Sequence, residues 1–428
     1  MTALKILNAK RLAFLILPIV FTIGSSFAPA SDLRTVAVLM IWITGLFYAV
    51  PALAMPIRLL RRVPSILWLL WLVAFITILV IWIVRFQPAV GLPISLTEQL
   101  WLWAGGITLI LLPVAGRISN EKARIGWLAG PLITITTLIF IIIGLEFGLR
   151  YLWVMSDNFQ FSKMHQNWNR LYWHPINEAG YRDYAVPTSN DDRQNILIMG
   201  DSLVTGYGIN TIADTFPHIL GDMLGTDYTV NIVAQPGWGV ASSFGALQAY
   251  PIVPDLVILS HYINDINEGT AAQQYGRPFP QIRVEPTDTQ RWWTDRFYIA
   301  NFLYYRVFLY TQYDSLGLYN EWVYGAYTDS QVWQAYQTEL QTVIDWTEET
   351  DIELIVLAWS DLINIEQSQV ITQPVIDFFE TQSISVIDMG QYIADLPLNQ
   401  RTVNPFDAHP SVMSHRLAAE QIAQVLSE

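Results

Sequence analysis

Residues 195–208 read NILIMGDSLVTGYG, and this stretch decides the fold of the part of the chain around it. The apolar, β-branched run 196–199 lies between polar Asn195 and Gly200, which predicts a buried strand of a parallel sheet. We expect a helix to begin in the residues that follow, so that Ser202 lies at a strand's carboxyl end beside a helix N-terminus. Ligands bind at that edge of open α/β sheets, but a serine there can equally be an N-cap. This stretch alone leaves both interpretations open.

Apolar runs and amphipathic segments alternate along the rest of the chain. Strands are expected at 228–233, 256–260, 352–358 and 385–388, and helices at 216–224, 330–347 and 411–426; residues 375–381 are expected to be part of a further helix. Such alternation predicts a parallel sheet with helices on both faces. An insertion at 271–330 interrupts the pattern with 16 aromatic residues in 60. The insertion can be ordinary packing, line a pocket or rest on a membrane interface, and the sequence leaves these three interpretations open.

Charge divides the 428-residue chain into two different parts. Residues 1–150 hold 12 Lys and Arg against 4 Asp and Glu, whereas residues 151–428 hold 11 against 33. The acidic part excludes nucleic-acid binding, because phosphate contacts need clustered Lys and Arg. The chain has no cysteine, which excludes disulfides, a thiol nucleophile and a Cys-based zinc site. The histidines show no metal-ligand spacing, so no metal site is expected.

The basic part contains five apolar segments, each long enough to cross a bilayer as a helix of about 20 residues. They run over Leu12–Ala28, Thr35–Met55, Ile66–Val84, Leu100–Ala115 and Gly126–Leu149. Flanking Lys and Arg residues favour one side by nine to three, which places the N-terminus in the cytoplasm and the chain after the fifth segment outside. We therefore predict a five-helix transmembrane region over 1–155, in the cytoplasmic (inner) membrane. Residues 156–428 are expected to form an extracytoplasmic domain.

Polar groups follow three of the expected strands: Ser202, Gly237 and Asn264. Far along the chain, Asp407 and His409 precede the last expected helix. Acyl transfer from an ester needs a hydroxyl nucleophile, a base for its proton, and a partner that orients the base. It also needs donors for the oxyanion, which the backbone amides of Ser202 and Gly237 and the side chain of Asn264 can supply. Together these residues predict a site for that chemistry.

This set of residues resembles the SGNH/GDSL hydrolase superfamily over roughly 177–428. The matching blocks are Gly200-Asp201-Ser202 with Gly206, then Gly237, then Asn264-Asp265, and finally Asp407 with His409-Pro410; residues 177–183 resemble the N-x-x-G-x-R-D approach segment of exported members. The resemblance implies a flavodoxin-like, three-layer α/β/α sandwich that needs no metal or other cofactor. It implies Ser202 as nucleophile, His409 as general base and Asp407 as the orienting acid, with Ser202, Gly237 and Asn264 forming the oxyanion hole. Asp201 and Asp265 are expected to have structural roles beside the site: Asp201 bonds to nearby backbone, and Asp265 acts as a cap or supports the residues that react.

The chain departs from the family pattern in its third and closing blocks. Tyr262 stands where the third block opens with glycine, and Ser414 stands where a glycine precedes the later histidine. Asp407 and His409 are separated by one residue instead of two, so the turn that carries Asp407 must differ from that of the family. The alternative interpretation of His409, which is followed by Pro410, is a structural residue at the start of a helix.

The expected function is that of a membrane-anchored serine esterase or O-acyltransferase. Its substrates would be acyl esters of envelope or extracellular glycans or lipids, and its partners the lipid bilayer and a membrane acyltransferase. The alternative is a non-catalytic SGNH-like domain that binds a glycan or a partner membrane protein. The five helices could also form an acyl-donor passage, but the absence of clustered charge or histidine within them favours an anchor or an interaction platform.

Overall fold

The computed structural model describes residues 138, 141–142, 144–158, 162–186, 193–268, 275, 286–308 and 313–428. The chain forms two compact units, Met1–Trp153 and Val154–Glu428. The first four predicted membrane segments, and most of the fifth, lie outside the described residues, so the five-helix region stays a prediction. No helix within the described residues is both long and apolar enough to span a bilayer.

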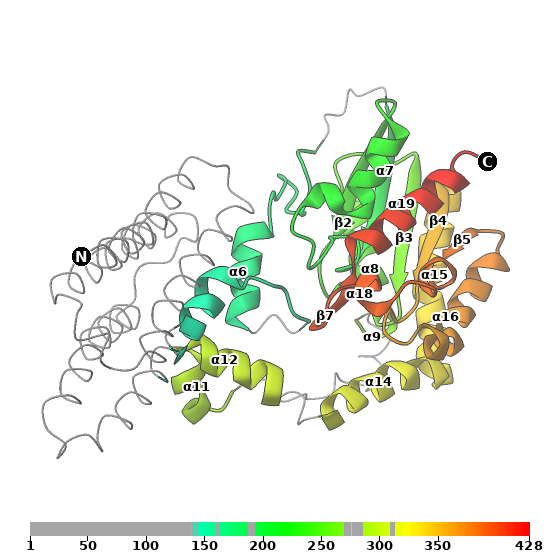
Figure 1. Cartoon of the computed structure of the whole chain (residues 1–428). Coiled ribbons are helices and arrows are strands. Elements are labelled where there is room, and N and C mark those ends of the chain that lie inside the picture. Colours follow the sequence, from blue (N-terminus) through cyan, green and yellow to red (C-terminus); the bar gives the residue numbers. More distant parts are fainter. Residues whose placement is uncertain are drawn as a thin grey trace, which may run out of the picture. The chain divides into compact units, whose positions relative to one another are not determined.

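Val154–Glu428 is built on a five-stranded parallel sheet in the order β2-β1-β3-β4-β5 (Figure 1). Its strands are β1 Gln194–Gly200, β2 Tyr228–Ala234, β3 Leu256–Tyr262, β4 Glu353–Trp359 and β5 Ser385–Asp388. This order is that of the flavodoxin-like doubly wound fold. The predicted α/β class, the parallel sheet and all five strand positions are confirmed.

Apolar side chains cover both faces of this sheet, since successive strand residues point to opposite faces. In β1, Leu197 and Met199 join one buried cluster, while Ile196 and Ile198 join the other. The first cluster includes residues of α8 (Val240–Gln248), α15 (Ser330–Glu349) and α16 (Ile365–Glu380). The second includes residues of α7 (Phe216–Leu224), α17 (Met389–Ile393) and α19 (Val412–Val425). Helices therefore pack on both faces, as predicted for three layers.

One helix prediction is wrong, whereas the segment 375–381 does form part of a helix, the C-terminal part of α16. No helix begins after Ser202; residues 201–208 form consecutive turns. Gly206 (φ 65°) and Gly208 (φ 84°) adopt left-handed backbone there, which interrupts a right-handed helix.

The remaining elements lie at the carboxyl edge of the sheet or in the insertion. They are α6 Lys163–Tyr172, η3 Ile212–Asp214, α9 Asp265–Glu268, α11 Asp288–Thr294, α12 Tyr298–Leu303, η4 Tyr304–Phe308, α14 Tyr313–Thr328, α18 Leu398–Arg401, β6 Thr402–Asn404 and β7 Asp407–Pro410; η2 Gly148–Leu152 precedes the domain. Strands β6 and β7 form a separate antiparallel hairpin. In the described part of the insertion, Tyr319, Trp322 and Tyr324 pack against the first core cluster, as ordinary packing predicts. Trp292 and Trp293 instead remain about half exposed, at 48% and 54%.

Candidate active site

A chain of hydrogen bonds joins three of the predicted site residues. His409 Nε2 lies 2.9 Å from Ser202 Oγ, and His409 Nδ1 lies 2.5 Å from Asp407 Oδ1. A carboxylate can only accept, so Nδ1 carries the ring proton and Nε2 is left to accept from the serine hydroxyl. Asp407 is 1% exposed and Ser202 is 8% exposed, whereas the His409 side chain is 17% exposed. A hydroxyl, an imidazole and a carboxylate thus meet in series, open to solvent mainly at the imidazole.

The short spacing between Asp407 and His409 follows from strand geometry. Both residues belong to β7, and residues i and i+2 of a strand point to the same face. The carboxylate therefore reaches the imidazole directly along one strand face. The alternative of His409 as a helix-start residue is wrong, because the N-cap of α19 is Ser411, whose hydroxyl accepts from the amide of Ser414.

Ser202 lies in the turn that follows β1. In this turn the amide of Thr205 donates to the carbonyl of Asp201 at 3.3 Å, and the amide of Tyr207 donates to the carbonyl of Ser202 at 3.0 Å. The backbone therefore curls without becoming a helix. The helix N-terminus expected beside Ser202 is absent from this turn, so its dipole is not available to stabilise negative charge.

Arg182, from the segment that resembles the family's approach segment, holds this turn from the protein interior. Its guanidinium donates to the carbonyl oxygens of Tyr172 (2.9 Å), Thr205 (2.9 Å), Gly206 (2.7 Å) and Ile209 (2.7 Å). Arg182 is 1% exposed, and burial lowers its pKa to about 10, so it remains charged at neutral pH. One buried cation thus satisfies four carbonyl groups, three of them in the loop just after Ser202.

Replacing Arg182 by methionine is expected to lower the free energy of unfolding by about 3–5 kcal/mol, because four carbonyls lose the hydrogen bond that each accepts from the buried guanidinium. Arg416→Met, at an exposed position on α19, serves as the control and should change it by no more than about 0.5 kcal/mol. Urea unfolding followed by tryptophan fluorescence measures both. A loss below about 1 kcal/mol for Arg182→Met would show that the carbonyls find other donors.

Asp201, between the strand and the serine, is buried and supports the turn. Its Oδ1 accepts from the amide of Leu203 at 2.9 Å, and its Oδ2 lies 3.4 Å from Ser202 Oγ. Burial raises the pKa of Asp201 to about 6. Burial also acts to raise the pKa of Asp407, but the charge of His409 and hydrogen bonds from its ring and amide outweigh it and hold that pKa below its ordinary value. Of the two carboxyls near the histidine, Asp407 is thus the one that stays ionised to lower pH.

The raised pKa of Asp201 predicts a pH-dependent stability. The carboxyl binds more protons in the folded than in the unfolded state between its ordinary pKa of 3.8 and about 6, so stability falls as pH rises through that window. Asp201→Asn removes this term. Between pH 4 and pH 7, the wild type should therefore lose about 2–3 kcal/mol more unfolding free energy than the variant. Urea unfolding of both proteins at the two pH values checks this; parallel curves would contradict it.

Gly237 and Asn264 follow the two strands that neighbour β1 in the sheet. Because β1 lies between β2 and β3 in the sheet, the loops after β2 and β3, which carry Gly237 and Asn264, flank the turn of Ser202. Gly237 adopts left-handed backbone with φ 82°. Asp265 Oδ2 accepts from the amide of Tyr262 at 3.0 Å and so closes the turn that carries Asn264. The predicted oxyanion donors come from adjacent strand ends, and Asp265 shapes one of them.

Several residues around the triad gave no signal in the sequence. The ring centroids of Tyr207 and His409 lie 4.4 Å apart, and the hydroxyl of Tyr207 donates to the carbonyl of Asp157 at 3.0 Å. His165 stacks on Tyr207 with 5.3 Å between ring centroids. Burial lowers the pKa of His165. Tyr207 could have been noticed because it lies in the stretch around Ser202, but nothing in the sequence indicates that residues near 157 and 165 reach it.

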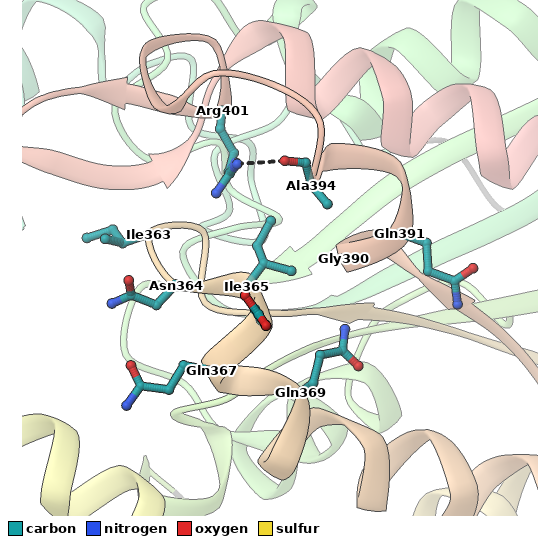
Figure 2. Close-up of a pocket in the computed structure, with 10 residues that line it drawn as sticks. Ile363, Asn364, Ile365, Gln367, Gln369, Gly390, Gln391, Ala394 and Arg401 are labelled. Atoms are coloured by element: carbon teal, nitrogen blue, oxygen red, sulfur yellow. Dashed lines mark hydrogen bonds between the residues drawn. The ribbon is translucent and has the colours of Figure 1, made fainter.

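A cavity of about 590 Å³ lies at the same edge of the sheet, beyond the ends of β4 and β5 (Figure 2). The start of α16 lines it with Ile363, Asn364, Ile365, Glu366, Gln367 and Gln369, and Gly390, Gln391, Ala394 and Arg401 complete the wall. The guanidinium of Arg401 donates to the carbonyls of Leu362, Ala394 and Leu396 at 2.8–3.0 Å, which ties the wall together. Because β4 is the neighbour of β3 in the sheet, this cavity lies beyond the strand next to the one that precedes Asn264.

Comparisons with known proteins find similarity only among solved structures. No protein-family model matches the chain, and no curated protein sequence matches it. A lipolytic protein of the G-D-S-L family from Desulfitobacterium hafniense is 12% identical, with 54% of this chain and 99% of that chain covered and a TM-score of 0.34. A G-D-S-L family member from Veillonella parvula is 14% identical (55% and 99% covered, TM-score 0.32), as is a carbohydrate acetylesterase family member from Sinorhizobium meliloti (54% and 97%, TM-score 0.32).

Proposed function

We propose that the chain is a serine esterase that works through an acyl-enzyme on Ser202. The observation that carries this proposal is the hydrogen-bonded series of Ser202, His409 and Asp407, assembled from positions about 200 residues apart in sequence. A hydroxyl held 2.9 Å from an imidazole whose other nitrogen faces a buried carboxylate is an activated nucleophile. A purely structural serine would need neither partner.

The reaction follows from these positions. Ser202 Oγ attacks the ester carbonyl carbon while its proton passes to His409 Nε2, and the carboxylate of Asp407 stabilises the resulting imidazolium. The oxyanion is held by the amides of Ser202 and Gly237 and by the side chain of Asn264. His409 then returns the proton to the leaving alcohol, which departs and leaves the acyl group on Ser202. Water, activated by His409, releases the acid; a sugar hydroxyl in place of water gives acyl transfer.

The non-catalytic alternative loses one of its two supports. The short Asp-x-His spacing favoured a binding protein, but β7 places both side chains on one face and in hydrogen-bond contact. Only Tyr262 in place of the usual glycine remains, and it lies in β3, two residues before Asn264. Hydrolysis of a short-chain aryl ester by the purified full-length protein tests the proposal. A folded protein without turnover would favour the binding function.

We further propose that the acyl group is carried by a glycan of the cell envelope and that residues 1–155 anchor the enzyme in the cytoplasmic membrane with this domain outside. Support for the glycan comes from the cavity beyond β4 and β5, where Asn364, Gln367 and Gln369 offer side-chain amides. Amides can donate to and accept from sugar hydroxyls, and the apolar side chains of Ile363 and Ile365 in the same wall can pack against a sugar ring or an acyl chain. Support for the anchor comes from the five apolar segments of the sequence.

The glycan proposal predicts a selective effect of Gln367→Ala combined with Gln369→Ala. Loss of two hydrogen bonds, each worth about 0.5–1.5 kcal/mol, should raise KM for an acetylated oligosaccharide by roughly ten-fold. KM for a short aryl ester, which has no sugar hydroxyls for these two side chains to bind, should change less than two-fold. Gln373→Ala, further along α16, is the control. Equal effects of the double variant on both substrates would contradict a sugar site in this cavity.

A further inference from the structure

The hairpin that carries Asp407 and His409 has little support of its own. Strands β6 and β7 contain three and four residues, their pairing is irregular between Thr402 and Asn404, and they do not join the main sheet. An isolated two-stranded hairpin is at best marginally stable in water. A hairpin this short needs partners elsewhere to hold a catalytic geometry within tenths of an ångström.

Residues 156–158, in the segment by which the chain enters this domain from its N-terminal part, supply such partners. The amide of Asn158 donates to the carbonyl of Phe406 at 3.3 Å, and the amide of Ala408 donates to Asn158 Oδ1 at 2.9 Å. Phe406 and Ala408 are the two neighbours of Asp407. Asn158 thus fixes the backbone on both sides of the triad carboxylate.

Ser156 contacts the same hairpin through Asn404. Asn404 Nδ2 donates to the Ser156 carbonyl at 3.3 Å, and it lies 3.4 Å from the Ser156 hydroxyl. A Cβ added to Gly208 would lie 2.8 Å from Asp407 Oδ2 and 2.9 Å from Ser156 Oγ, so the glycine, the hydroxyl and the carboxylate meet closely. The Ser156 side chain is also one of the groups that lower the pKa of Asp407.

Asp157, between them, connects the hairpin to the wall behind His409. Its carbonyl accepts from the hydroxyl of Tyr207, whose ring lies against His409. Its carboxylate lies 3.6 Å from Arg306 Nη2, and the guanidinium carbon of Arg306 lies 3.9 Å from the ring centroid of Phe406. Both sides of the acid–base pair are therefore tied to one short stretch of chain.

We propose that Asn158 and Ser156 are positioning residues, which hold the β6–β7 hairpin so that Asp407 and His409 stay aligned on Ser202. The inference rests on the proposed esterase function. It means that the active site is completed by the segment that follows residues 1–153, so the entry to the domain and its catalytic hairpin form one unit. A displacement of that segment would misalign the acid–base pair without touching Ser202.

The test compares Asn158→Ala with Asn158→Asp in the full-length protein. Alanine removes the side-chain acceptor for the amide of Ala408, whereas aspartate keeps an oxygen at that position. Since a misplacement of about 1 Å can cost 10²-fold in rate, we expect Asn158→Ala to lower kcat for a short aryl ester by roughly 10- to 100-fold, with KM changed less than two-fold. Asn158→Asp should stay within about three-fold of wild type. Asn169→Ala, at an exposed position on α6, should leave both constants unchanged.

A second readout separates positioning from stability. The rate at which a fluorophosphonate labels Ser202 should fall in Asn158→Ala by the same factor as kcat, in protein whose melting temperature shows it to be folded. If Asn158→Ala does not fold, Ser156→Ala, which removes only a hydroxyl, is measured in its place and should lower kcat about three- to ten-fold. Wild-type kcat in the folded variants would overturn the positioning role alone. Absence of turnover and labelling in the wild type would overturn the proposed function instead.

Discussion

Ser202→Ala is expected to lower kcat/KM for a short-chain aryl ester by about four orders of magnitude or more. The hydroxyl is the atom that forms the acyl-enzyme, and removal of such a nucleophile in serine hydrolases leaves only the contribution of the oxyanion donors and of binding. The fold should survive, because the hydroxyl's neighbours in the structure are the His409 ring and, at 3.4 Å, Asp201. Steady-state hydrolysis by the full-length variant measures the loss.

The control for this variant is Ser243→Ala. Ser243 lies buried in α8, where its hydroxyl donates to the carbonyls of Gly239 and Val240. It shares the burial of Ser202 but has no imidazole partner, so its kcat/KM should stay within about two-fold of wild type. If Ser202→Ala retained more than about a hundredth of the wild-type activity, another residue would have to be the nucleophile.

Asp407→Asn is expected to lower kcat by about 10³- to 10⁴-fold. The amide cannot stabilise the imidazolium, and its NH₂ group can donate to Nδ1 and so favour the tautomer in which Nε2 no longer accepts from Ser202. Asp407 is nearly fully buried and hydrogen-bonded to the ring at 2.5 Å, so no water can replace it easily. The pH-independent region of kcat for the aryl ester measures the effect.

Asp201→Asn is the matched comparison, because both carboxyls lie near the histidine. An asparagine at 201 keeps an oxygen that can accept from the amide of Leu203. The carboxylate that it replaces lies 3.4 Å from Ser202 Oγ, which is a weak contact, so kcat should fall less than about ten-fold. The order of the two effects therefore decides which carboxyl orients the base. A larger loss for Asp201→Asn than for Asp407→Asn would contradict the assignment of Asp407.

The central sheet could be predicted because strands that are buried on both faces consist almost entirely of apolar residues. Strands β1, β3 and β4 are nearly continuous apolar runs. Such runs are typical of parallel sheets that are covered by helices on both faces. The same runs place Ser202, Gly237 and Asn264 at one edge, since the carboxyl ends of parallel strands coincide. Family resemblance added His409 and Asp407, which periodicity alone would not connect with that edge.

What could not be predicted depends on contacts between distant segments or on backbone conformation. The residues after Ser202 are expected to begin a helix, but they form turns in which Gly206 and Gly208 adopt left-handed backbone. The reach of Asp407 to His409 depends on the β7 strand, whose partner β6 is too short to show a pattern. Asn158 lies about 250 residues from the hairpin that it binds, and an isolated polar residue gives no sign of such a partner.

The most direct test of the account is to react the full-length protein with a fluorophosphonate and locate the adduct by peptide mass spectrometry. An acyl-enzyme mechanism on an activated serine predicts a single covalent adduct on Ser202, with labelling abolished in His409→Ala because the base that takes the hydroxyl proton is gone. A folded protein that gains no adduct, or that gains it on another residue, would contradict the account.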